Sequence, residues 1–152
     1  MRTKLLITDV DNTLFDWQNF WFETFSAMSD RAIEIAAVDP GLFYNECSSI
    51  HQKHGTTEYS QLLEELPCLR ERFGEHVLAA MQPAIDSFRE ARTRTLTLYP
   101  GVISTLRALR SAGIVIAAFT ESLAFYSNYR FRKLGLDGLV AFLYSPPDHE
   151  LA

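Results

Sequence analysis

The stretch LLITDVDNTLFDW, residues 5–17, decides how the rest of the chain is interpreted. It begins with a short apolar run, which is typical of a strand buried on both faces in a parallel sheet. The run ends at Asp9 and Asp11, two aspartates separated by one residue. Two ionised carboxylates this close repel each other, which costs free energy unless a positive group offsets the repulsion. We therefore expect the pair to face a cation.

The composition of the chain limits its class. The 152 residues suit one domain, or one domain with a small insert, and the 47% hydrophobic and 22% charged residues are ordinary for a globular protein. A net charge of −5 argues against nucleic acid or an anionic membrane as a partner. No apolar stretch approaches the roughly 18 residues of a membrane span, and the N-terminus becomes acidic too early for a signal peptide. Two unrelated cysteines, Cys47 and Cys68, favour a reduced, cytoplasmic protein.

The middle of the chain has helical periodicity and no convincing strand pattern. Apolar residues spaced by three and four predict a helix over about 19–37. Further helical stretches are predicted over about 42–54, 59–66 and 78–88. Pro83 lies inside the last of these, so we expect a kink or a new start there.

The C-terminal part alternates between helix and strand patterns. A helix beginning at Val102 and ending near Gly113 precedes an apolar strand at 114–119. A second helix, for which Ser122 is the candidate N-cap, precedes a strand at 139–144. Its last turn carries Arg130, Arg132 and Lys133, where the helix dipole favours cations. This order implies parallel pairing and right-handed crossovers.

The sequence therefore predicts an α/β fold. We expect a Rossmann-like three-layer core with a parallel sheet of about three strands, built from residues 1–15 and 97–152. An all-helical insert, residues 16–96, interrupts the core.

Polar residues stand where the first two predicted strands end. Open parallel sheets bind ligands at the carboxyl ends of their strands, and Asp9 and Thr120 occupy those positions. Residues two apart leave a strand on the same side, so Asp9 and Asp11 are expected to face one point above this edge.

Mg²⁺ and a phosphate group together suit such an arrangement. Mg²⁺ takes oxygen ligands and keeps water or phosphate oxygens as further partners. One carboxylate could then attack phosphorus, and the other could move a proton. The Thr120 hydroxyl could donate to a phosphate oxygen, and a helix starting near Ser122 would attract an anion.

The motifs DVDNT (9–13), YPGV (99–102) and IVIAAFTES (114–122) occur in this order, with the first and last at strand ends. In this the chain resembles the haloacid dehalogenase-like superfamily. The resemblance implies that Asp9 is the nucleophile that forms an aspartyl-phosphate and is a Mg²⁺ ligand. It implies that Asp11 is the general acid/base and also serves the metal through its backbone carbonyl.

The same resemblance implies roles for Thr120, Glu121 and the helical insert. Thr120 would hold the transferring phosphoryl group, with the backbone N–H of Glu121 as a second donor, and the helical insert would be a cap that shapes the substrate pocket. Dehalogenases of the superfamily commonly lack the second aspartate, so Asp11 favours a phosphatase acting on a small phosphorylated metabolite.

The chain departs from the family pattern near its C-terminus. Members carry a lysine and an acidic pair beyond the third strand, and Lys133, Asp148 and Glu150 do not stand where those motifs belong. We therefore expect a truncated form of a longer protein. The strand bearing Asp9 would then have an open edge, which invites pairing with a second copy of the chain.

Other interpretations of the two aspartates remain open. Asp-x-Asp-x-Thr also begins calcium loops, but Leu14 and Phe20 occupy the places of the required glycine and glutamate. The aspartates could simply form a turn. Within the resemblance, the alternatives to a phosphatase are a non-catalytic binding or regulatory relative, an inactive fragment, and a phosphomutase.

Overall fold

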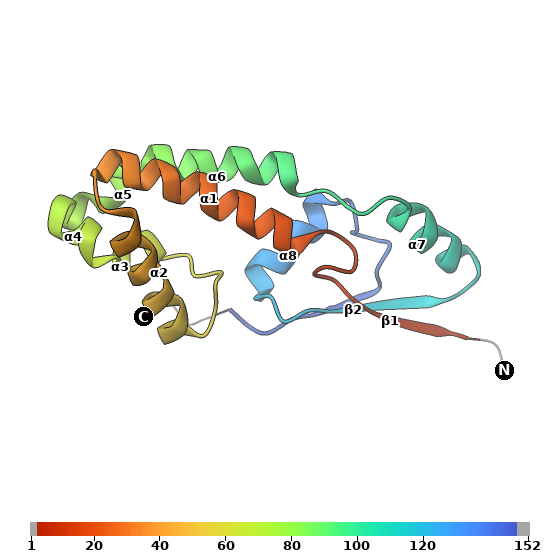
Figure 1. Ribbon diagram of the computed structural model, residues 1–152. Helices are drawn as coiled ribbons and strands as arrows, with labels where there is room; N and C mark the ends of the chain where they lie inside the picture. Colours follow the sequence, from red (N-terminus) through yellow and green to blue (C-terminus); the bar gives the residue numbers. More distant parts are fainter. Residues whose placement is uncertain (1–2, 149–152) are drawn as a thin grey trace. The chain divides into compact units, whose positions relative to one another are not determined.

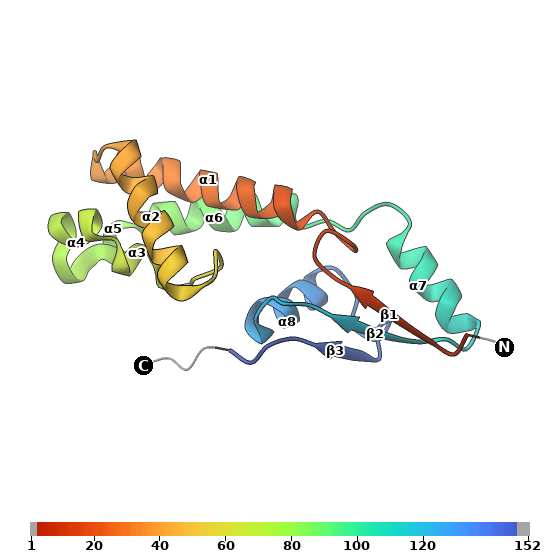
Figure 2. The same ribbon diagram turned by 60° about the horizontal axis from the view of Figure 1, so that its bottom comes forward.

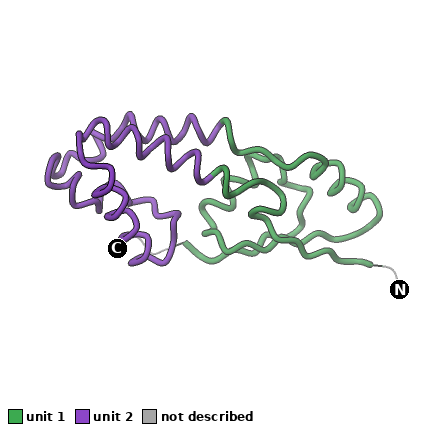
Figure 3. The backbone as a smooth tube through the Cα atoms, in the orientation of Figure 1, with its two compact units in different colours: residues 1–20, 94–152 green, residues 21–93 purple. Residues whose placement is uncertain are grey.

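The computed structural model describes residues 3–148. It separates into two compact units, one of residues 1–20 and 94–152 and the other of residues 21–93 (Figure 3). The first contains the sheet and is called here the sheet unit. The second is called the helical unit.

The sheet unit contains three strands within the described residues. These are β1 (Leu5–Asp9), β2 (Val115–Phe119) and β3 (Phe142–Tyr144). All pairings are parallel and the order is β1-β2-β3, so the predicted α/β fold with a short parallel sheet is confirmed.

The register of the sheet brings the strand ends together. Asp9, the last residue of β1, pairs with Phe119, the last residue of β2, which in turn pairs with Tyr144 at the end of β3. The residues that follow β1 and β2 therefore leave the sheet at one edge, as the sequence predicted.

Two helices accompany these strands on one side of the sheet (Figures 1 and 2). They are α7 (Val102–Ser111), which precedes β2, and α8 (Ala124–Lys133), which joins β2 to β3. Both crossovers advance in the same direction along the sheet, and right-handed crossovers of this kind place their helices on one face. Gly113, with a φ of 77°, follows the end of α7 and donates its N–H to the Arg110 carbonyl, as expected of an end cap.

The predicted role of Ser122 as the N-cap of α8 is wrong. The cap residue is Leu123, which makes no side-chain cap hydrogen bond. Instead the Phe125 N–H donates to Oδ1 of Asp148 over 2.7 Å. The Ser122 hydroxyl is unavailable as a cap because it takes part in the strand-end contacts described below.

The two faces of the sheet differ in exposure. Ile116 and Ala118, on the side of the helices, are 1% and 0% exposed. The opposite face carries six large apolar side chains that are exposed: Leu5, Ile7, Val115, Phe119, Phe142 and Tyr144. Strand β1 pairs with β2 alone within the described residues, so it is an edge strand with one unpaired side. The pairing of that edge with a second chain stays a prediction.

The helical unit is built from a series of helices and has no strand among its residues. The elements are α1 (Trp17–Ala36), α2 (Pro40–His54), α3 (Leu62–Glu65), α4 (Pro67–Phe73), η1 (Gly74–His76), α5 (Val77–Ala80) and α6 (Gln82–Thr95). The first turn of α1 and the end of α6 belong to the sheet unit. None of the helices in residues 3–148 is long and apolar enough to cross a membrane.

Prolines set two of the helix boundaries. Pro67 opens α4, and Pro83 lies in the first turn of α6, which confirms the expected new start there. Both positions are favourable because the first turn of a helix leaves its N–H groups without intrahelical partners.

The core of the helical unit joins residues from most of its helices. Phe43, Leu66, Leu69 and Met81 are each 0% exposed and belong to one apolar cluster. Phe43 is the largest of them, and burial of its ring contributes strongly to the stability of the unit.

We predict that Phe43→Ala lowers the free energy of unfolding of the helical unit by about 3–5 kcal/mol, because it removes a buried ring and leaves a cavity. Urea denaturation followed by helical circular dichroism measures the change. Leu42→Ala is the control, since Leu42 is 48% exposed and its loss should cost less than about 1 kcal/mol. Equal effects of the two substitutions would contradict this assignment of the core.

Candidate functional site

The loop after β1 forms a tight turn that is fixed by local contacts. The N–H groups of Thr13 and Leu14 both donate to the Val10 carbonyl. Asn12 has a φ of 55°, a left-handed conformation that asparagine tolerates, and its side chain accepts the Gln18 N–H over 3.0 Å. The turn thus links the end of β1 to the first turn of α1.

Asp9 and Asp11 lie in different surroundings. Asp9 is exposed, and Oγ1 of Thr13 donates to its Oδ2 over 3.1 Å. Asp11 is partly buried, and its side chain is 20% exposed. The loop after β2 and helix α8 supply the partners of Asp11.

Two hydroxyls from the loop after β2 donate to the same oxygen of Asp11. Oγ1 of Thr120 lies 2.6 Å and Oγ of Ser122 lies 3.0 Å from Oδ2 of Asp11. The Ser122 N–H in turn donates to Oγ1 of Thr120, which is 1% exposed. The structure therefore directs the Thr120 hydroxyl at Asp11. The sequence predicted only that Thr120 lies at the same end of the sheet as Asp9.

Arg130 on α8 is a member of this candidate site that the sequence interpretation missed. Its Nη1 donates to Oγ of Ser122 over 2.9 Å and lies 3.5 Å from Oδ1 of Asp11. The sequence suggested only a cation favoured by the dipole at the helix end. Its spacing indicated burial, because Arg130 shares the buried side of α8 with Ser127 and Phe131, but the spacing did not indicate Asp11 as the partner.

Aromatic rings surround the Arg130 guanidinium. Its carbon lies 5.8 Å from the ring centre of Phe15, 5.2 Å from that of Phe20 and 5.8 Å from that of Tyr126. Burial lowers the pKa of Arg130 to about 10, and the nearby Asp11 carboxylate acts in the opposite direction. Arg130 is therefore a cation at neutral pH, and it offsets the charge of Asp11 within the protein.

Asp9 is the carboxylate best suited to a metal ion. It is exposed and offers hard oxygen, which Mg²⁺ prefers, and Mg²⁺ sites often use one or two carboxylates together with water. Oδ1 of Asp11 is buried and makes no hydrogen bond to any described residue, although it faces Arg130. Residues 3–148 contain no group of three or more His, Cys, Asp or Glu side chains placed to hold a metal. The donors fit Mg²⁺ with water as the main ligand, and a contribution from Asp11 stays a prediction.

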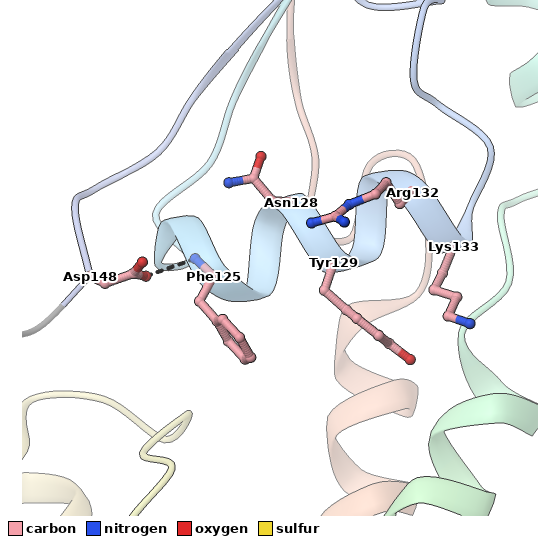
Figure 4. A pocket seen from close by; sticks show the side chains of 6 residues that line it. All are labelled: Phe125, Asn128, Tyr129, Arg132, Lys133 and Asp148. Atoms are coloured by element: carbon pink, nitrogen blue, oxygen red, sulfur yellow. Dashed lines mark hydrogen bonds between the residues drawn. The ribbon is translucent and has the colours of Figure 1, made fainter.

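Other polar residues near the C-terminus lie elsewhere on α8. Figure 4 shows a pocket along this helix, lined by Phe125, Asn128, Tyr129, Arg132, Lys133 and Asp148. Lys133 and Asp148 therefore belong to this pocket, consistent with leaving them out of the catalytic motifs. Glu121 is exposed beside Thr120, and Glu150 lies outside the described residues.

Comparison with known families identifies the class of the protein. The model of the haloacid dehalogenase-like hydrolase family matches residues 3–152. The chain therefore belongs to this family, which agrees with the resemblance seen in its motifs. A comparison with curated proteins gave no match.

Solved structures of this class share the fold. A 2-haloacid dehalogenase from Pseudomonas syringae pv. Tomato DC3000 has a TM-score of 0.61 and 22% identity, with 95% of this chain and 64% of that chain covered. A haloacid dehalogenase-like hydrolase from Xanthomonas campestris has a TM-score of 0.60 and 16% identity, with 95% and 61% covered. A Thermotoga maritima protein assigned as a beta-phosphoglucomutase has a TM-score of 0.57 and 18% identity, with 94% and 61% covered. The chain thus spans less than two thirds of the length of these structures.

We predict that Thr120→Val lowers the free energy of unfolding by about 2 kcal/mol, because it removes a buried donor to the Asp11 carboxylate. Chemical denaturation measures the loss. Thr105→Val, the same substitution at an exposed position of α7, should change stability by less than about 0.5 kcal/mol. If Thr120→Val is as mild as this control, the hydrogen bond to Asp11 does not contribute as described.

Proposed function

We propose that the protein hydrolyses a small phosphomonoester with Mg²⁺ through an aspartyl-phosphate on Asp9. The observation that carries the proposal is the contrast between the two aspartates. Asp9 is exposed at the strand end, whereas Asp11 is partly buried among hydroxyl donors and an arginine. Two carboxyl groups in different environments can take different catalytic roles.

The chemistry follows from these positions. A carboxylate oxygen of Asp9 attacks phosphorus, the bond from phosphorus to the leaving oxygen breaks, and Asp11 gives that oxygen a proton. Asp11 then takes a proton from water, whose oxygen attacks phosphorus, releases phosphate and restores the Asp9 carboxylate. When bound, Mg²⁺ would offset the negative charge of the phosphoryl oxygens.

Thr120 and Glu121 complete the proposed phosphate site. The Glu121 N–H would donate to a phosphoryl oxygen. When substrate is bound, the Thr120 hydroxyl would donate its hydrogen bond to the phosphate in place of Asp11. Cytoplasmic metabolites with a single phosphate group are the proposed substrates, in keeping with two buried free cysteines, Cys47 and Cys68.

This activity is proposed for the whole protein. The matched structures are longer than this chain, and the family resemblance implies a lysine and an acidic pair that steady the phosphate and the metal. The helical unit is proposed to act as the cap over the substrate.

A non-catalytic relative that binds phosphate is the second candidate. It is favoured by the small number of acidic ligands, since residues 3–148 hold no cluster of three metal-binding side chains. A phosphomutase would use the same residues as the phosphatase and would differ in its product.

We predict that Asp9→Asn abolishes Mg²⁺-dependent phosphate release from p-nitrophenyl phosphate, because the amide cannot serve as the nucleophile. Phosphate release and covalent phosphorylation of the protein are measured together. Asp16→Asn, a change of the same kind in the following loop, is the control and should retain activity.

Three results would count against the phosphatase. Retained turnover in Asp9→Asn would refute the role of Asp9. Halide release from a 2-haloacid without phosphate release would indicate a dehalogenase. Tight Mg²⁺-dependent binding of beryllofluoride with no turnover of any phosphomonoester would favour the binding protein.

A further inference from the structure

We propose that Arg130 is a positioning residue that holds the Asp11 carboxyl group in the orientation needed for proton transfer. The inference deepens the proposed function and rests on it, since Asp11 acts as acid and base only if that function is correct. Arg130 itself lies behind Asp11 and is not assigned any contact with substrate.

The contacts of Asp11 restrict rotation of its carboxyl group. Oδ2 accepts hydrogen bonds from Thr120 and Ser122, over 2.6 and 3.0 Å, and Oδ1 faces Nη1 of Arg130 at 3.5 Å. Because the two oxygens face different partners, turning the group would break contacts on both sides. Catalytic groups need such support to stay within a fraction of an ångström of the productive geometry.

Ser122 links the arginine to the other oxygen. Its hydroxyl lies between Nη1 of Arg130, at 2.9 Å, and Oδ2 of Asp11, at 3.0 Å. The backbone around it is also held, because Oγ of Ser127 donates to the Ser122 carbonyl over 2.9 Å. Arg130 therefore acts on Asp11 directly and through Ser122.

The guanidinium is itself fixed in place. Its side chain is 4% exposed, and the rings of Phe15, Phe20 and Tyr126 lie within 6 Å of it. A planar guanidinium suits both stacking and directed hydrogen bonds, which a lysine ammonium does not reproduce. The rings come from the loop after β1, the first turn of α1 and α8, so three segments fix the orientation of Arg130.

Stability alone gives a weak reason for this arrangement. Burying an ion pair removes two charges from water, and apolar residues of similar volume often stabilise a fold as well or better. Here the buried cation contacts the aspartate proposed to transfer protons. A role in orienting that aspartate explains the position of the charge.

The test compares Arg130→Met and Arg130→Lys in the full-length protein with Mg²⁺. Two substrates are used: p-nitrophenyl phosphate, whose leaving group needs little protonation, and ethyl phosphate, whose leaving group needs an acid. We expect Arg130→Met to lower kcat for ethyl phosphate by about 100-fold and for p-nitrophenyl phosphate by less than about 10-fold, with KM within about threefold. Arg130→Lys should restore part of the loss.

Controls separate positioning from folding. Arg132→Met changes an exposed arginine of the same helix and should leave both rates unchanged. If Arg130→Met does not fold, Arg130→Lys decides the question, because it keeps a buried cation and removes the planar guanidinium; unchanged rates with both substrates would overturn the positioning role. Ser122→Ala removes the hydroxyl that links Arg130 to Asp11 without burying an unpaired charge. It should show the same preferential loss with ethyl phosphate.

The outcomes distinguish this inference from the proposed function. Equal losses with both substrates in a folded variant, or no loss, would overturn the positioning role while leaving the phosphatase intact. If the unsubstituted protein releases no phosphate from either substrate, the proposed function fails, and the inference fails with it.

Discussion

The contact between Arg130 and Asp11 is the interaction on which the arrangement of the polar side chains at the strand ends depends. Asp11 follows β1, and Arg130 belongs to α8, which joins β2 to β3. Ser122 and Thr120, after β2, complete the same network. A few polar side chains therefore connect segments that lie far apart in the sequence. Asp11 and Thr120, for example, are 109 residues apart. Breaking one partner would leave a charge buried without compensation, which is strongly unfavourable.

This network changes the meaning of the two neighbouring aspartates. The sequence suggested that both face one cation, because their spacing makes their repulsion costly. The structure divides them: Arg130 offsets the charge of Asp11, and Asp9 remains exposed for a ligand. Their repulsion is thus reduced by a cation within the protein. A metal at Asp9 would add to this arrangement and would not be needed to hold Asp11 in place.

The sequence predicted the architecture well because the relevant signals are local. Apolar runs ending at Asp9 and Thr120 located two strands, and parallel topology alone placed their ends together. Ser122 and Arg130 were misjudged because each had an adequate local explanation, as a helix cap and as a cation at a helix end. Their real partners lie far away in the sequence, and spacing along one helix does not identify such partners.

The stability of the sheet unit depends on whether another surface covers its exposed apolar face. Monomeric proteins rarely leave a contiguous patch of large apolar side chains in contact with water. Any surface that covered Leu5, Ile7 and Phe119 would bind the folded state in preference to the unfolded one. The melting temperature would then rise with the concentration of that covering partner, through mass action. Stability measured on the chain alone is therefore a lower bound for the sheet in its covered form.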